Sequence, residues 1–456
     1  METVTLGVGV IAATIVLLIP LRYGLLVYLI TLLYYPSYLR FIVFGCTISV
    51  GRLVIAALLI RCLLDGKLRQ EFKWTKLDTL IVIADAVYML VLSFAVGDIV
   101  AVIKMRSGSM LDTTFAYFSA RFIINNRAVL VNFVKAAAVI LVVMAFLGVF
   151  EAVTTVSPYK GLMAHYFYAE RALGASKFAN QEVIVGHGLE SRFGFFRAQG
   201  PQPHPIIFGA SFVVFLPLVW KLLYNKKWLS LRIPIFGAIT VGGVSSLSST
   251  PFTGLIVAIG GLVFERFARW TKPLLVLGLL LCIFVEFYSE KRHFYYILFA
   301  KMSVLGGAGF DRGRLVDAAI KHLPEYWLTG YGYSDPSWGL EVGGTDYTDV
   351  CVNYVYLAVM YGIFGLLAYL TIIFNLLSSL WRRYRKSVET IDRNIYWAVI
   401  VSIAVILAID LGVAPFGALP SLNSIIFGIG GSVISLGFNG RYTAEVPRTV
   451  LIANHI

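Results

Sequence analysis

Apolar residues form continuous runs along this chain rather than an alternating pattern. Runs of ~20 residues, the length that crosses a bilayer as a helix, recur along nearly the whole sequence. A membrane β-barrel strand would instead alternate with a period of two, and lipid offers backbone polar groups no partner outside a helix or a closed barrel. The pattern predicts an all-α, polytopic integral membrane protein with about twelve transmembrane helices.

The expected spans fall into two groups. The C-terminal runs are well separated, at 206–224, 230–248, 252–268, 272–290, 351–380, 394–412 and 418–438. The N-terminal runs lie at 4–20, 22–35, 41–64, 79–98 and 128–150, with a shorter candidate at 110–125. No internal repeat or separate soluble domain interrupts them, so residues 1–456 are expected to form a single membrane domain.

Composition supports this class of protein. The 456-residue chain is 59% hydrophobic and only 14% charged, against ~25% charged residues in soluble domains, and its mean hydropathy is +0.81. The net charge of +13 is explained by basic residues in cytoplasmic loops, which orient membrane helices, so nucleic acid is not an expected partner. The four cysteines are scattered without metal-ligand spacing, and the N-terminus has no cleavable signal pattern.

Basic connectors define one side of the expected bundle. The segments WRRYRK, ERFARWTK and YNKKW all fall on the same side and are assigned to the cytoplasm. Two long loops, about 151–205 and 291–350, then lie together on the opposite side. For the N-terminal helices two orientations stay open. If 110–125 spans the membrane, the basic loop 65–78 is cytoplasmic. If 110–125 does not span it, the N-terminus is cytoplasmic instead.

Each long loop carries two closely spaced arginines in a turn-rich segment or at a helix start. In the first loop an interfacial helix is expected at 159–178, followed by Arg192 and Arg197 in the turn-rich segment SRFGFFRAQGPQPHPIIFG. In the second loop Arg312 and Arg314 stand at the start of an amphipathic helix that ends at Pro324. Helix N-termini favour anions, and arginine binds phosphate oxygens through two parallel hydrogen bonds. The alternative is that these side chains reach lipid headgroups.

Other kinds of site have less support. No HExxH, CxxC, GxSxG or P-loop pattern occurs, so zinc or nucleotide chemistry has no recognisable motif. Charged residues within apparent spans are candidates for a functional role by default, because burying a charge in lipid is costly. They also leave open the alternative that the protein is a polysaccharide or ion-coupled transporter. They are Arg52, Asp85, Lys135, Glu286 and Asp410.

Several segments together resemble the O-antigen ligase and polymerase superfamily of bacterial membrane glycosyltransferases. The segment from Arg197 to Gly209 (RAQGPQPHPIIFG) looks like the family's arginine-to-glycine turn into a span. In the same order follow a serine-rich turn at 246–254, an arginine segment at 313–332 and a helix entry at 353–367. Ligases usually carry a histidine where this chain has Asn353, and asparagine can orient a hydroxyl but cannot act as its base.

The resemblance implies a function at the periplasmic face of the bacterial inner membrane. A polysaccharide polymerase would transfer glycan repeat units from a polyprenyl diphosphate carrier to another lipid-linked unit, with inversion and without metal or cofactor. The departure at Asn353 favours a polymerase over a ligase that acts on lipid A core or protein. Membrane lipids, a chain-length regulator and a flippase are the further partners considered.

The same resemblance assigns roles to residues. Arg197 and Arg314, followed by Arg192 and Arg312, are expected to hold the diphosphate. The candidates for catalysis are Asn353, Asp349 and His204. The residues expected to shape the turns and scaffold are Gly200, Pro205, Gly209 and Gly313.

Overall fold

The computed structural model describes most of the chain. The described residues are 2–43, 46–157, 191–224, 226–288, 293–305 and 309–436. The interfacial helix expected at 159–178 and the basic C-terminal segment lie outside them.

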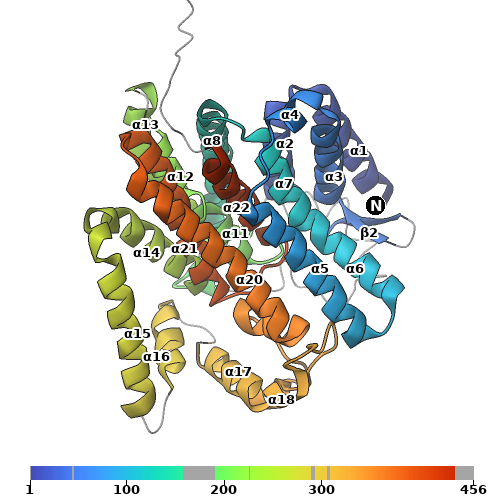
Figure 1. The fold of residues 1–456 in the computed structure, drawn as a ribbon, viewed down its shortest axis with the longest axis vertical. Helices are drawn as coiled ribbons and strands as arrows, with labels where there is room; N and C mark the ends of the chain where they lie inside the picture. Colours follow the sequence, from blue (N-terminus) through green and yellow to red (C-terminus); the bar gives the residue numbers. More distant parts are fainter. Residues whose placement is uncertain are drawn as a thin grey trace, which may run out of the picture.

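The protein is mostly helical, as the hydrophobic pattern predicts (Figure 1). Within the described residues, seven helical segments are long and apolar enough to cross a membrane, which indicates a membrane protein. They are α5 (Lys76–Val96), α8 (Arg127–Thr154), α11–α12 (Pro205–Leu222), α14–α15 (Ser249–Tyr288), α20 (Asn353–Lys386), α21 (Thr390–Asp410) and α22 (Leu419–Leu436). Shorter apolar helices are α1 (Glu2–Leu18), α2 (Gly24–Tyr34) and α13 (Lys226–Val244). The total of about twelve spans stays a prediction.

The expected span at 41–64 is wrong in its first part. Strands β1 (Arg40–Val43) and β2 (Cys46–Ser49) form an antiparallel hairpin, and helix α3 (Val50–Leu64) begins only after it. β-Branched residues such as Ile42 and Thr47 favour strands, and the Ser49 side chain caps the helix by accepting a hydrogen bond from the amide of Arg52 at 3.3 Å. A second short hairpin joins β3 (Ser191–Arg192) to β4 (Phe195–Phe196), so the described fold is not purely α-helical.

The short run at 110–125 does not form one helix. Helix α6 (Ile99–Asp112) ends before Thr113, and helix α7 (Thr114–Ile123) begins directly after that residue. Helix α7 is almost entirely buried and packs against α22. The two helices together bring the chain back from the end of α5 to the start of α8.

The connectors around the N-terminal helices meet at one end of the bundle. The side chain of Asn125 donates to Glu71, in the loop 65–78, at 2.7 Å. The adjacent Arg127 pairs with Glu389 at 3.0 Å, just beyond the basic end of α20. The basic loop 65–78 therefore lies at the same end as WRRYRK, in agreement with the first of the two orientations considered.

The other basic connectors reach this same end. Lys221, at the end of α12 (Leu216–Leu222), pairs with Glu265 of the 3₁₀ helix η2 (Glu265–Trp270). Lys221 also donates to Asn394, near the start of α21, at 3.4 Å. In Figure 1 helix α4 (Gly66–Glu71) lies at the upper end, whereas helices from the second long loop lie at the lower end.

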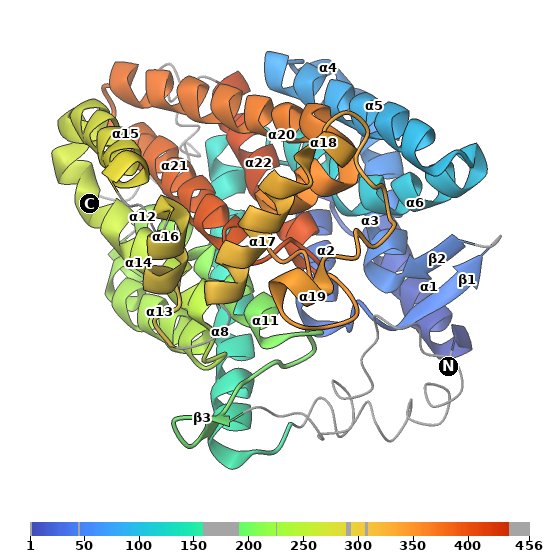
Figure 2. The same ribbon diagram turned by 90° about the horizontal axis from the view of Figure 1, so that it is seen from below.

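The two long loops meet at that lower end. The guanidinium of Arg192 donates to the carbonyl of Leu247 at 3.2 Å and to that of Leu305 at 3.4 Å, which joins the first loop to the start of the second. The second loop folds into short helices over an aromatic cluster of its own and can be followed in Figure 2. Its helices are α16 (Phe294–Met302), α17 (Gly309–Lys321), α18 (Leu323–Tyr326) and α19 (Gly339–Val342).

Helix α20 is broken near its start by the second loop. Gly362 has φ of 62°, outside the helical region. The backbone groups freed by this break are satisfied by the loop: Tyr331 donates to the carbonyl of Val359 at 2.7 Å, and Ile363 donates to that of Trp327 at 2.7 Å. A side chain at 362 would meet the carbonyl oxygen of Leu328 at 2.4 Å, so glycine is required there.

Candidate functional site

The serine-rich turn between α13 and α14 is the centre around which the first-loop arginines gather. Leu247 adopts a positive φ of 46° in this turn, and the side chains of Ser246 and Ser248 are buried. Ser246 donates back to the carbonyl of Gly243 at 2.8 Å, which fixes the turn onto the end of α13. Its carbonyl oxygens and hydroxyl groups face the first loop and offer acceptors to cationic side chains.

Arg197 is buried against this turn. It donates to the hydroxyl of Ser248 at 2.6 Å and to the carbonyl of Ser246 at 3.5 Å, and only 6% of the residue is exposed. Burial lowers the pKa of the guanidinium from its usual value, because desolvation disfavours the charged form. Arginine nevertheless stays charged at physiological pH, so this side chain places a positive charge in a poorly solvated position.

The turn that carries Arg197 is held by a residue that the sequence analysis did not select. Glu151, in the last turn of α8, accepts hydrogen bonds from the backbone amides of Gln199 at 3.3 Å and Gly200 at 2.7 Å. It is 1% exposed. An acidic residue near a helix C-terminus opposes the helix dipole, and this local conflict is the signal in FEAVTT that could have marked Glu151 as having a specific partner.

His204 lies between the arginines and the next span. Its Nδ1 accepts a hydrogen bond from the amide of Ile206 at 3.1 Å, so the imidazole caps the N-terminus of α11 (Pro205–Val213). Burial, and then the positive charges of Arg197 and Arg192, lower the pKa of His204 to about 4. The imidazole is therefore neutral near pH 7, and its proton resides on Nε2 because Nδ1 is an acceptor.

The expected scaffold residues occupy crowded positions in the same turn. Gly200 has φ of 53°, and a side chain there would meet Phe208 at 2.8 Å. A side chain at Gly209 would meet the hydroxyl of Ser246 at 2.3 Å. Pro205 stands at the first turn of α11, where its missing amide hydrogen costs nothing. These residues bring the first loop against the serine-rich turn.

We expect Gly209→Ala to destabilise the fold. The added methyl group has no space next to Ser246, and overpacking of this kind costs about 1–3 kcal/mol. Thermal unfolding of the purified protein should show lower stability. Gly237→Ala, in α13, is the control, since a side chain there meets nothing within 4 Å and alanine favours the helix. Equal stability of the two variants would contradict the packing argument.

Arg312 approaches the same region from the second loop. It donates to the carbonyl of Gly412 at 2.9 Å, and Gly412 in turn abuts Thr250, in the first turn of α14. Asp349 stands near Arg312 and is exposed on one side to solvent. Partial desolvation raises the pKa of its carboxyl from the usual value, and the positive charge of Arg312 opposes this rise. The carboxyl of Asp349 therefore holds a proton more readily than a fully solvated carboxyl does.

Arg314 is placed differently. It is exposed, its guanidinium lies 4.9 Å from the ring centroid of Phe310, and it donates to the carbonyl of Val342 at 3.4 Å. Its neighbour Gly313 packs against Tyr296, whose ring a side chain would meet at 2.2 Å. The structure thus brings Arg192, Arg197 and Arg312 to adjoining turns and directs Arg314 toward the surface of the second loop.

Asn353 belongs to a separate feature, a cavity of about 410 Å³ between the N-terminal helices and α20 and α22. The residue is 4% exposed and begins α20. The four loop arginines, His204 and Asp349 do not line this cavity. Phe416 does, and its ring contacts the ring of His204 with centroids 6.2 Å apart, so the cavity and the arginine region adjoin.

The charged residues expected within spans all have identified contacts. Asp85 pairs with Arg106 at 2.7 Å, Arg52 pairs with Asp112 at 2.6 Å, and Glu286 lies 2.6 Å from His293. Lys135 lies 5.9 Å from the ring centroid of Trp228, and Asp410 accepts from Tyr369 at 2.5 Å. Sequence reasoning did not select Arg106, because it lies outside the expected spans, and it passed over Asp112, which lies at the start of the candidate span 110–125.

Comparison of the sequence with known protein families and curated proteins identifies no relative. No protein-family model matches the chain, and no curated protein matches it. The resemblance to the O-antigen ligase and polymerase superfamily therefore rests on the short motifs in the sequence.

Proposed function

We propose that this protein is a polysaccharide polymerase that elongates lipid-linked glycans at a membrane surface. The observation that supports it best is the gathering of Arg192 and Arg197 from one loop and Arg312 from the other around adjoining turns. The two loops are joined there by the bridge that Arg192 makes between Leu247 and Leu305.

The proposed chemistry needs what these arginines provide. In the reaction the bond between the sugar C1 and the diphosphate oxygen breaks, and the diphosphate leaves with the electron pair. The acceptor hydroxyl forms the new C1–oxygen bond from the opposite face, which inverts the configuration, and loses its proton to a base. Fixed cationic donors at a poorly solvated site stabilise the charge that develops on the leaving diphosphate. Arg197 is the best placed for this role, because its charge is buried.

The acceptor side has three candidates with different properties. Asp349, with its raised pKa and its position near Arg312, is our candidate for the base. His204 is neutral and already accepts a backbone hydrogen bond through Nδ1, so its proposed role is to hold the turn and to offer Nε2–H. Asn353 has an amide that can orient a hydroxyl group but not remove its proton.

The distribution of charge supports an orientation in the membrane. The connectors rich in lysine and arginine meet at one end of the bundle, and by the positive-inside rule this end faces the cytoplasm. The two loops and the arginine region then face the periplasm or cell exterior. We therefore propose a multi-pass protein of the bacterial inner membrane, with a polyprenyl-diphosphate-linked oligosaccharide as donor and a chain-length regulator and a flippase as partners.

Incubation of the purified protein with a lipid-linked repeat unit tests the proposal. We expect products that carry two or more repeat units, formed equally well with and without a chelator of divalent cations. Extension that occurs only when lipid A core is supplied would instead identify a ligase. Unchanged substrate with both acceptors would refute glycosyl transfer and favour the transporter alternative.

A further inference from the structure

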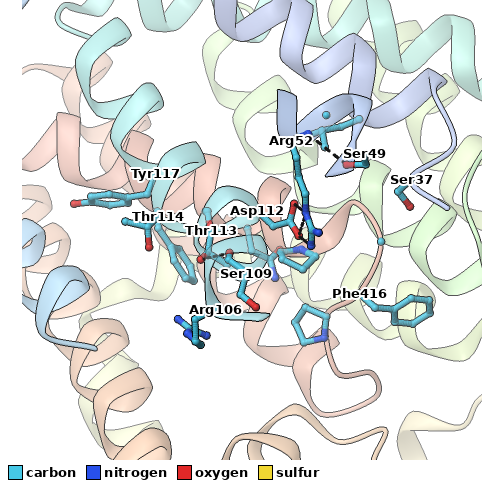
Figure 3. A pocket seen from close by; sticks show the side chains of 18 of the residues that line it. Ser37, Ser49, Arg52, Arg106, Ser109, Asp112, Thr113, Thr114, Tyr117 and Phe416 are labelled. Carbon is cyan, nitrogen blue, oxygen red and sulfur yellow. Dashed lines mark hydrogen bonds and ion pairs between the residues drawn. The ribbon is translucent and has the colours of Figure 1, made fainter. Parts of the chain in front are cut away.

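The cavity beside the arginine region contains chemistry that the proposed function has not used. Its volume of about 410 Å³ lies within the range of ~300–1,000 Å³ typical of pockets that hold small molecules. It extends from the turn 415–417 down to Asp85, in the middle of α5. Figure 3 shows Arg52, Asp112 and Arg106 projecting into this region, with Phe416 to one side.

Two pairs of opposite charges line the cavity, and each pair is neutralised within it. On one side Asp85 accepts from Arg106 at 2.7 Å and from the hydroxyl of Thr114. On the other side Arg52 makes a bidentate contact with Asp112, the shortest distance being 2.6 Å. A carboxylate or phosphate ligand would therefore meet arginines that already have anionic partners. A third lining arginine, at position 40, has a more exposed side chain and donates to the carbonyl of Ser37 at 3.2 Å.

The remaining lining residues are tyrosines, amides and small hydroxyl side chains. Tyr88 and Tyr361 lie with ring centroids 4.5 Å apart, and the guanidinium of Arg106 lies 5.0 Å from the first ring and 5.7 Å from the second. Aromatic rings held rigidly in this way give flat apolar walls beside polar groups. Such walls suit the C–H faces of sugar rings.

One buried amide oxygen in the cavity can accept a hydrogen bond from a ligand. Asn423, in α22, is 7% exposed, and its Oδ1 is buried without a hydrogen-bond partner among the described residues. An unsatisfied buried acceptor costs free energy until a donor reaches it. A ligand hydroxyl would supply that donor, and the carboxylates of Asp85 and Asp112, which line the same cavity, can accept further hydroxyl groups.

We propose that this cavity binds an uncharged, hydroxyl-rich ligand, namely a neutral sugar unit, and discriminates against acidic sugars. The contact between Phe416 and His204 places the bound sugar next to the arginine region, where it is suited to be the acceptor end of the glycan. The role as acceptor rests on the proposed function, but binding of the sugar does not.

Calorimetric titration of the purified full-length protein tests this proposal. The probes are a panel of neutral hexose disaccharides and, for each, the matched disaccharide in which one hexose is replaced by its uronic acid. We expect at least one neutral probe to bind about tenfold or more tightly than its acidic counterpart. Asn423→Leu should weaken its binding by about tenfold, because a buried hydrogen bond is lost, and Asp112→Asn should shift the preference toward the acid.

Two controls separate this proposal from the proposed function. Asn394→Leu removes an amide at the opposite, basic end of the bundle and should leave binding unchanged. Arg197→Ala should also bind the neutral probe normally, since Arg197 does not line the cavity. The proposal would be overturned if no neutral probe bound, or if the acidic probes bound as tightly as the neutral ones. It would also be overturned if Asn423→Leu bound the neutral probe with unchanged affinity. Binding without any glycan transfer in the wild-type protein would refute the polymerase alone.

Discussion

Replacement of Arg197 by alanine is expected to lower the rate of glycan elongation by about 10²–10³-fold, the loss typical when one fixed donor to a developing negative charge is removed. The arginine is buried, donates to the hydroxyl of Ser248 at 2.6 Å, and adjoins the contacts of Arg192 on the same turn. In cells the variant should accumulate single repeat units in place of long polymer, and the purified variant should show the same loss with a lipid-linked repeat unit.

Two further variants make this result specific. Arg197→Lys keeps the charge but loses the planar, bidentate donor, so it should restore only a small part of the rate. Arg314 was the other arginine that the sequence favoured for holding the diphosphate. Arg314→Ala should lower the rate much less, since that side chain is exposed and lies over Phe310. A normal chain-length ladder with Arg197→Ala would reject the arginine assignment, and an equal loss with Arg314→Ala would show that the second loop moves during the reaction.

The helices were largely predictable from the sequence, because continuous apolar runs have few alternatives in lipid. One exception has a local cause and the other a tertiary one. The run from 41 to 64 contains enough β-branched residues to begin as a hairpin, and Ser49 then caps the helix. The break between α6 and α7 at Thr113 is not visible as a proline or glycine. Tertiary contacts decide it, since α7 is buried against α22.

The candidate site was predictable only in part. The turn chemistry of the RAQG segment pointed to Arg197, and the helix start in the second loop pointed to Arg312. Which of Arg312 and Arg314 turns inward depends on how α17 rotates on Tyr296 and Gly412, a packing detail that no local pattern encodes. The cavity was missed for the same reason: Asp85, Asp112 and Asn423 come from separate helices and line one cavity only after folding.

The largest expected effect on folding comes from Asp78, at the start of α5. Its carboxylate accepts from Nε and Nη2 of Arg121, both at 2.9 Å, and from the hydroxyl of Tyr117 at 2.7 Å. Both charged side chains are almost fully buried, with 0% and 2% exposed. Asp78→Ala would leave the guanidinium of Arg121 buried without its carboxylate, which typically costs about 3–5 kcal/mol. Denaturant unfolding of the purified protein in detergent would measure this loss.

The position of the pair explains why the effect should spread. Arg121 also donates to the carbonyl of Lys73 at 2.8 Å and to the hydroxyl of Ser435 at 3.1 Å, so one guanidinium joins the basic loop, α7 and α22. Glu341→Ala is the matched control, because it breaks an ion pair with Lys321 that is exposed to solvent and should scarcely change stability. If Asp78→Ala unfolded at the same denaturant concentration as Glu341→Ala, the buried pair would not hold these elements together. Replacement of both partners by apolar residues, Asp78→Leu with Arg121→Met, should recover much of the stability lost in the single variant.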